Sequence, residues 1–205
     1  MKPSFWNSGK LYLSKNDKVL KKIIQKYQKE NLNVNSNYFE CLINSIIGQQ
    51  ISVKAANSIK DRFFSMKLKI NPKNISSIDK RKLRKIGLSN QKVNYVKNLS
   101  IFFLENSIFI KNIDKYENEE IRRKLILIKG IGNWTIDMFL IFSLSRSNIL
   151  PVGDLGLLKA ISINYKKKLP LKEKTLDYYY KKWSPYSTVA TWYLWRSLDP
   201  LPINY

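Results

Sequence analysis

The stretch from Leu127 to Lys159, LIKGIGNWTIDMFLIFSLSRSNILPVGDLGLLK, decides the fold. It holds the only Gly-x-Gly of the chain, Gly130-Ile131-Gly132, between two apolar segments with helical spacing. Glycine tolerates the positive φ that ends many helices, and Asn133 is a good N-cap for a helix that begins at Trp134. The stretch therefore predicts a helix, a tight glycine hairpin and a second helix. The N–H groups at the start of the second helix would form a site for a phosphate.

A second motif follows about twenty residues after Trp134, where Pro151-Val152-Gly153-Asp154 places an acid at the start of another helix. GIGNWTIDMF followed by PVGDLGLLKA resembles the helix-hairpin-helix DNA glycosylases that carry a Gly/Pro-rich loop and a catalytic Asp. The closest resemblance is to the 3-methyladenine, alkylation-repair branch, and it covers roughly Val34 to Trp195. It implies an all-α fold of two helical lobes with an active-site cleft between them and Asp154 at its mouth.

The same resemblance implies that residues 1–205 form a single glycosylase domain. The N-terminal helices would pack with the C-terminal helices as one lobe, and approximately 52–150 would form the second lobe, which carries the hairpin. Helical periodicity runs through the chain, and strand-like alternation is scarce. The expected helices are Lys18–Glu30, Tyr38–Gln49, Val53–Met66, Ser77–Lys85, Asn90–Glu105, Glu119–Ile128, Trp134–Ser145, Leu155–Ile163, Lys172–Trp183 and Thr188–Leu198.

Composition points to a polyanionic partner. The 205 residues carry a net charge of +22 and are 44% hydrophobic, which suits a folded protein that binds nucleic acid before membrane. A Lys-rich composition without a charged partner is the alternative. One cysteine, Cys41, and no histidine argue against a disulfide, an iron–sulfur cluster or a metal held by side chains. We expect no cofactor, apart from a monovalent cation that the hairpin carbonyls could bind.

No apolar run approaches the ~20 residues of a membrane span, and the N-terminus lacks the apolar core of a signal peptide. We therefore expect an intracellular monomer that makes no membrane contact. Its location would be cytoplasmic and nucleoid-associated in a bacterium, or nuclear in a eukaryote.

Asp154 is the candidate catalytic residue. Hydrolysis of an N-glycosidic bond requires a flipped nucleotide, stabilised positive charge on the sugar and a delivered water. A carboxylate beside C1′ can meet the last two needs. The alternative role of Asp154 is an N-cap alone. Asp137 is the second candidate acid, but a solvated or capping role suits it better.

Trp134 decides the subclass that the resemblance implies. Glycosylase/lyases carry a nucleophilic lysine at this position, and an indole cannot form a Schiff base. We therefore expect an enzyme without lyase activity. Trp134 and Trp195 would form an aromatic wall for a cationic alkylated base, with Met138 as additional lining.

Candidate DNA contacts fall into three groups. Gln49 and Gln50, in IIGQQIS, match the family segment that enters the minor groove, with Gln50 as the residue that fills the gap left by the flipped base; two solvated glutamines are the alternative. Ser89 and Lys92 match a phosphate-binding turn or, equally, a packing corner. The hairpin contributes Lys129, Gly130, Gly132 and Thr135.

The C-terminal segment Trp183-Ser184-Pro185-Tyr186-Ser187-Thr188 resembles the family's W-x-P-Y-R-S, except that Ser187 replaces the arginine. The role of that arginine is therefore in doubt here. We predict a monofunctional glycosylase that removes alkylated purines, of the 3-methyladenine and 7-methylguanine type, from double-stranded DNA. The alternatives are a non-catalytic helix-hairpin-helix protein that binds DNA damage, or a glycosylase for oxidised or deaminated bases.

Overall fold

The computed structural model of the chain describes residues 2–66 and 68–198. All regular structure in those ranges is helical, which confirms the all-α class. None of the described helices is long and apolar enough to cross a bilayer. The elements are α1 (Trp6–Asn16), α2 (Lys18–Lys26), α3 (Tyr38–Gly48), α4 (Val53–Phe64), α5 (Pro72–Ser77), α6 (Lys80–Lys85), α7 (Asn90–Glu105), α8 (Ser107–Lys111), the 3-10 helix η1 (Ile113–Lys115), α9 (Asn118–Leu125), α10 (Asn133–Phe142), α11 (Leu155–Tyr165), α12 (Glu173–Trp183) and α13 (Ser187–Leu198).

The ten expected helices all have counterparts, with differences at their ends and in number. The expected helix Ser77–Lys85 corresponds to α6, which begins only at Lys80, and the preceding α5 was not expected. Asn71 caps α5 ahead of Pro72, and the Asp79 side chain caps α6, so the chain restarts the helix at Lys80. Helices α1 and α8 were not expected.

The described chain divides into two compact units, and each is described by itself. One unit contains the chain up to Asn35 and from Leu140 onward, and the other runs from Ser36 to Phe139. The second unit begins earlier than the expected 52, because α3 packs against α4 and α7. The division falls within α10.

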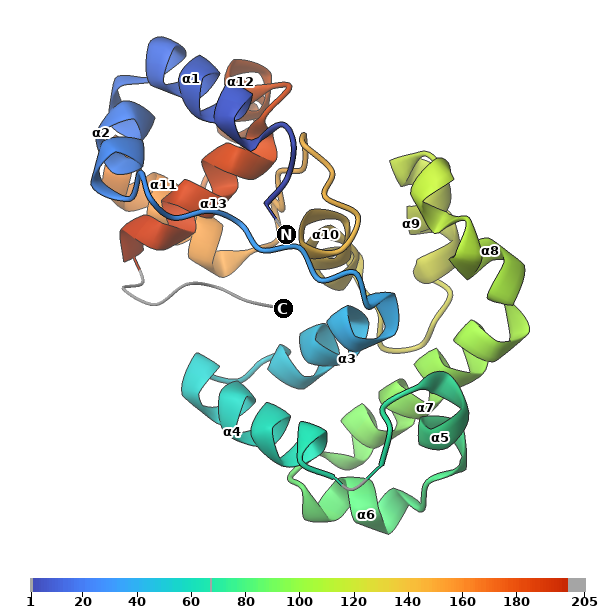
Figure 1. The fold of residues 1–205 in the computed structure, drawn as a ribbon. Coiled ribbons are helices and arrows are strands. Elements are labelled where there is room, and N and C mark those ends of the chain that lie inside the picture. The colour runs from blue at the N-terminus through green and yellow to red at the C-terminus, as the bar shows by residue number, and fades with distance from the viewer. Residues whose placement is uncertain (1, 67, 199–205) are drawn as a thin grey trace. The chain divides into compact units, whose positions relative to one another are not determined.

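Helix α13 is the buried centre of the first unit. Its ten residues from Ser187 to Arg196 are all buried, and it packs against α1, α2, α11 and α12 (Figure 1). Trp6 of α1 meets Trp192 edge to face, with ring centroids 5.3 Å apart. The buried Arg196 guanidinium forms an ion pair with Glu30, in which Nη2 donates to Oε1 at 2.8 Å and Nε lies 2.7 Å from Oε2. The charge of this arginine is therefore neutralised inside the unit.

Asp17 joins three elements of the same unit. Its Oδ1 accepts the Val19 and Leu20 N–H groups and so caps α2. Its Oδ2 accepts from the Tyr165 hydroxyl at 2.9 Å, Trp183 Nε1 at 3.1 Å and Lys182 Nζ at 3.0 Å. Burial alone would raise the pKa of Asp17, but these hydrogen bonds outweigh it and hold the pKa below its usual value.

The second unit is built around α3 and α7. Eight of the eleven residues of α3 are buried, as expected for a helix that is apolar on nearly all sides. Phe39 of α3 meets Phe103 of α7 with ring centroids 5.2 Å apart, and α5, α6 and α8 also pack on α7. The hairpin lies against this core, because the Tyr95 ring of α7 is directly beside Gly130.

Replacing Asp17 with Asn should lower the free energy of unfolding by about 1–3 kcal/mol at pH 7, because buried donors lose a charged acceptor. The lowered pKa means that the stabilisation is fully present above the unfolded pKa and is lost as pH falls through the folded value. The difference between the two proteins should therefore shrink below about pH 4. Urea unfolding at pH 7 and at pH 3 measures both effects.

The matched control is Asp177→Asn, which changes an exposed aspartate of α12. It should alter stability by less than about 0.5 kcal/mol at either pH. An Asp17→Asn protein as stable as this control at pH 7 would contradict the role given to Asp17.

Candidate functional site

Asp154 stands at the N-terminus of α11, in the first unit. Its Oδ1 accepts the Leu157 N–H at 2.6 Å and Trp195 Nε1 at 2.8 Å. The N-cap alternative is therefore observed, but the second bond ties the carboxylate to α13, which capping does not require. Trp195 is itself fixed by parallel stacking on Phe142, with centroids 6.0 Å apart. The result is a half-buried carboxylate with a defined orientation at a positive helix end.

Gly156 is a part of this site that the sequence did not reveal. A Cβ at this position would lie 3.1 Å from Asp154 Oδ1 and 3.6 Å from Trp195 Nε1. The missing side chain lets the indole approach the carboxylate across the first turn of α11. The signal in the sequence is the second glycine of the segment GDLG, where an ordinary helix would gain from a residue with a side chain.

The glycine hairpin in the second unit has the predicted helix–turn–helix form. Gly130 has φ of +106°, and a Cβ there would lie 2.1 Å from the Tyr95 ring, so only glycine fits. Helix α10 begins at Asn133, one residue earlier than expected. Gly132 is exposed and has open space beside it, and Lys129 is exposed. The N-terminus of α10 is thus accessible to solvent, and the phosphate contact stays a prediction.

Gln49 has a structural role at the hairpin, and its expected DNA contact stays a prediction. Its Nε2 donates to the Gly130 carbonyl at 2.9 Å and to Thr135 Oγ1 at 3.0 Å. Thr135 is almost completely buried, so its side chain faces the protein interior. Both side chains tie the end of α3 to the hairpin.

Gln50 differs from its neighbour in both exposure and backbone. Its side chain is exposed, and its φ of 55° is left-handed, a conformation that costs a non-glycine residue about 1–2 kcal/mol. Such strain in an exposed turn is typical of functional positions. The structure is therefore compatible with the predicted wedge.

Ser89 and Lys92 form a packing corner. Ser89 caps α7 by accepting the Lys92 N–H at 3.2 Å. The Lys92 ammonium bonds the carbonyls of Ile47 and Gln49, at 2.7 and 2.8 Å, and burial lowers the pKa of this lysine. The Lys92 side chain stabilises the end of α3 in this structure, which favours the packing alternative over a phosphate contact.

The remaining predicted residues of α10 have different surroundings. Trp134 is half-buried, whereas Met138 is completely buried and belongs to the core, which corrects its expected place in the pocket lining. Asp137 is buried and forms an ion pair with Arg122 of α9. Asp137 therefore links the two helices of the hairpin motif, which corrects the expected solvated or capping role.

Ser187, which replaces the family arginine, is completely buried at the start of α13. Its backbone N–H donates to Asn148 Oδ1 at 3.4 Å. At this position the chain has an internal packing residue.

Comparison with known proteins gives consistent results. Residues 43–185 match the model of the HhH-GPD superfamily base excision DNA repair proteins. DNA-3-methyladenine glycosylase 1 of Schizosaccharomyces pombe is 32% identical over 190 residues, which cover 90% of this chain and 83% of that protein. DNA-3-methyladenine glycosylase of Saccharomyces cerevisiae is 34% identical over 154 residues, which cover 70% of this chain and 52% of that protein.

A solved structure has a closely similar fold. The Schizosaccharomyces pombe 3-methyladenine DNA glycosylase Mag1, in complex with abasic DNA, superposes with a TM-score of 0.82 at 30% identity. The match covers 93% of this chain and 96% of that chain.

Proposed function

The chain belongs to the HhH-GPD superfamily of base excision DNA repair proteins, and from this membership we propose that it is a DNA glycosylase for alkylated purines. It hydrolyses the N-glycosidic bond of 3-methyladenine and 7-methylguanine type lesions in double-stranded DNA, as a monomer, and leaves an abasic site. The relatives that are named 3-methyladenine glycosylases support this substrate class. The observation that carries the proposal is the Asp154 carboxylate, held by Trp195 and the α11 N-terminus.

Asp154 would act on the sugar of a flipped nucleotide. As the glycosidic bond lengthens, positive charge develops on the sugar, and a fixed carboxylate stabilises that charge without having to reorient. The same group can orient the water that attacks C1′. An alkylated purine is cationic and leaves easily, so the mechanism needs no strong general acid.

Trp134 supports a monofunctional reaction. A lyase step requires an amine that attacks C1′, and the indole at this family position has none to offer. Lys129, the nearby lysine, lies before the glycines of the hairpin and not at this position. The aromatic wall of Trp134 and Trp195 stays a prediction.

The hairpin would anchor the DNA backbone through the N-terminus of α10. A monovalent cation on its carbonyls stays a prediction. The Gly130 and Ile128 oxygens already accept Gln49 Nε2 and the Ile131 N–H, both at 2.9 Å, and each carbonyl keeps a second lone pair that a cation could use. These oxygens would hold the ion, which would add positive charge beside a phosphate.

The central test compares wild type with Asp154→Asn on methylated duplex DNA. Asparagine is as good an N-cap as aspartate, so this change keeps α11 intact while it removes the charge. We expect wild type to release 3-methyladenine and 7-methylguanine, and the variant to be slower by about 100-fold or more. Strand nicking should appear only after alkali.

The outcomes separate the alternatives. Equal rates for the two proteins would show that Asp154 is only a cap. A folded wild type that binds abasic DNA without releasing bases would indicate a damage-binding protein. Release of 8-oxoguanine in place of 3-methyladenine would indicate an oxidised-base enzyme, and nicking before alkali would disprove the assignment of Trp134.

Gly156→Ala tests the packing behind Asp154. The added methyl group would push the carboxylate or the indole by a few tenths of an ångström, so we expect the excision rate to fall about tenfold, while the protein stays folded. Gly153→Ala is the control, because its Cβ would meet nothing within 4 Å. Single-turnover rates at saturating enzyme remove effects on DNA affinity. Equal rates for the two variants would contradict this role.

The two adjacent glutamines should separate stability from DNA binding. Gln49→Ala should lower the free energy of unfolding by about 1–2 kcal/mol, because it breaks the bonds to Gly130 and Thr135. Gln50→Ala should leave stability nearly unchanged but weaken binding to abasic-site DNA several-fold, because the wedge is lost. Thermal unfolding and fluorescence anisotropy measure the two effects. Unchanged abasic-DNA affinity in Gln50→Ala would eliminate the wedge.

A further inference from the structure

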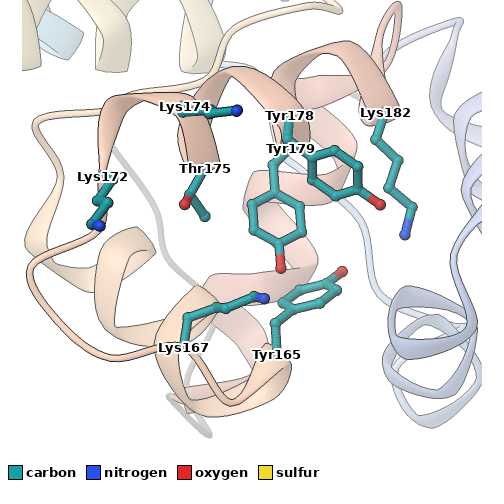
Figure 2. A pocket seen from close by; sticks show the side chains of 8 residues that line it. All are labelled: Tyr165, Lys167, Lys172, Lys174, Thr175, Tyr178, Tyr179 and Lys182. Carbon is teal, nitrogen blue, oxygen red and sulfur yellow. The ribbon is translucent and has the colours of Figure 1, made fainter.

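A cavity of about 560 Å³ lies at the end of α11 opposite Asp154 (Figure 2). All of its lining residues come from one segment of the first unit: Tyr165, Lys167, Lys172, Lys174, Thr175, Tyr178, Tyr179 and Lys182. Helix α11 has 11 residues, so its two ends are about 16 Å apart. The cavity is therefore separate from the catalytic group proposed above, and the proposed chemistry does not use it.

The charged residues that line the cavity are all basic. Four of its lining residues are lysines and none is acidic. On α12, Lys174, Tyr178 and Lys182 recur every four residues and share a face, whereas the acids Glu173 and Asp177 lie about 100° away around the helix. Lys182 is neutralised from behind by the buried Asp17. The positive charge that remains for a ligand comes from Lys167, Lys172 and Lys174, whose side chains are all exposed.

Three tyrosine rings line the same cavity. The rings of Tyr165 and Tyr179 lie 4.7 Å apart, and those of Tyr178 and Tyr179 lie 5.3 Å apart. The cluster is fixed from below, because Tyr179 stacks on the buried Trp183 and the Tyr165 hydroxyl bonds Asp17. Tyr178 is 57% exposed. The packed tyrosines therefore hold Tyr178 in place, and its ring is exposed to solvent among ammonium groups.

This combination favours one kind of ligand. Ammonium groups bind phosphates, and an exposed ring offers a surface on which a base can stack. Lys167, Lys172 and Lys174 are three separate exposed ammonium groups around one cavity, so they suit a chain of phosphates better than a single anion. Bases inside a duplex are already stacked and cannot lie on Tyr178. We propose that this cavity binds a single-stranded nucleic-acid segment, with Lys167, Lys172 and Lys174 on its phosphates and Tyr178 against a base.

The proposal goes beyond the glycosylase reaction and does not depend on it. The test measures binding of a short fluorescent single-stranded thymidine oligonucleotide to the full chain by anisotropy. The variant Lys172→Glu/Lys174→Glu should raise the Kd at least tenfold, and Tyr178→Ala should raise it at least fivefold. Both should release 3-methyladenine from methylated duplex DNA as wild type does, because Asp154 and the hairpin are unchanged.

The matched control is Lys168→Glu/Lys181→Glu, which makes the same charge change at two exposed lysines outside the cavity. Its Kd should rise less than threefold. An equal loss in the control would overturn the proposal, because net charge alone would then explain binding. Equal weakening on an undamaged duplex, or full competition by millimolar inorganic phosphate, would also overturn it in favour of a simple phosphate site. Thermal unfolding confirms that each variant is folded.

Discussion

The bond between Trp195 Nε1 and Asp154 Oδ1, 2.8 Å long, is the interaction on which the candidate active site depends. It joins Asp154, the N-cap residue of α11, to the buried helix α13. The Trp195 indole is also stacked on Phe142, so packing in the first unit fixes the orientation of the carboxylate. Gly156 belongs to the same arrangement, since a side chain there would separate the two partners. A group that stabilises a developing charge is most effective when it is already in place, and packing provides that placement here.

The hairpin of the second unit is held by similar means, with a polar tie in place of an indole. Gly130 lets the Tyr95 ring lie directly against the backbone, and the Gln49 amide joins the Gly130 carbonyl to the buried Thr135 hydroxyl. These contacts satisfy polar groups that would otherwise be buried without partners. They also leave the next residue, Gln50, exposed in a left-handed turn. A rigid hairpin and an exposed neighbour thus arise from one short sequence, Gly48-Gln49-Gln50.

Local patterns in the sequence predicted the features that depend on neighbouring residues. Periodicity and capping predicted both ends of α7 correctly. The glycines predicted the hairpin, and the position of Asp154 predicted an acid at the start of α11. The contacts that the sequence did not reveal join distant residues: Gln49 reaches Thr135 across 86 positions, and Lys92 reaches Ile47 across 45. Local periodicity carries no information about such bonds. A Gln or Lys in the sequence does not indicate which distant residue its side chain will contact. Gly156 was missed for the same reason, because its value lies in a contact from α13.

Net charge is informative only when the individual lysines are located. Lys92 and Lys97 of α7 turn their ammonium groups onto backbone carbonyls, so these two groups already have partners inside the protein. Lys167, Lys172 and Lys174 behave differently, because they lie on exposed positions around a cavity whose lining contains no acid. A Lys-rich composition by itself would scatter charge over all faces of a helix. Three exposed lysines beside a fixed tyrosine cluster, with no acid in the cavity lining, are therefore stronger evidence for a phosphate-bearing ligand than the total of +22.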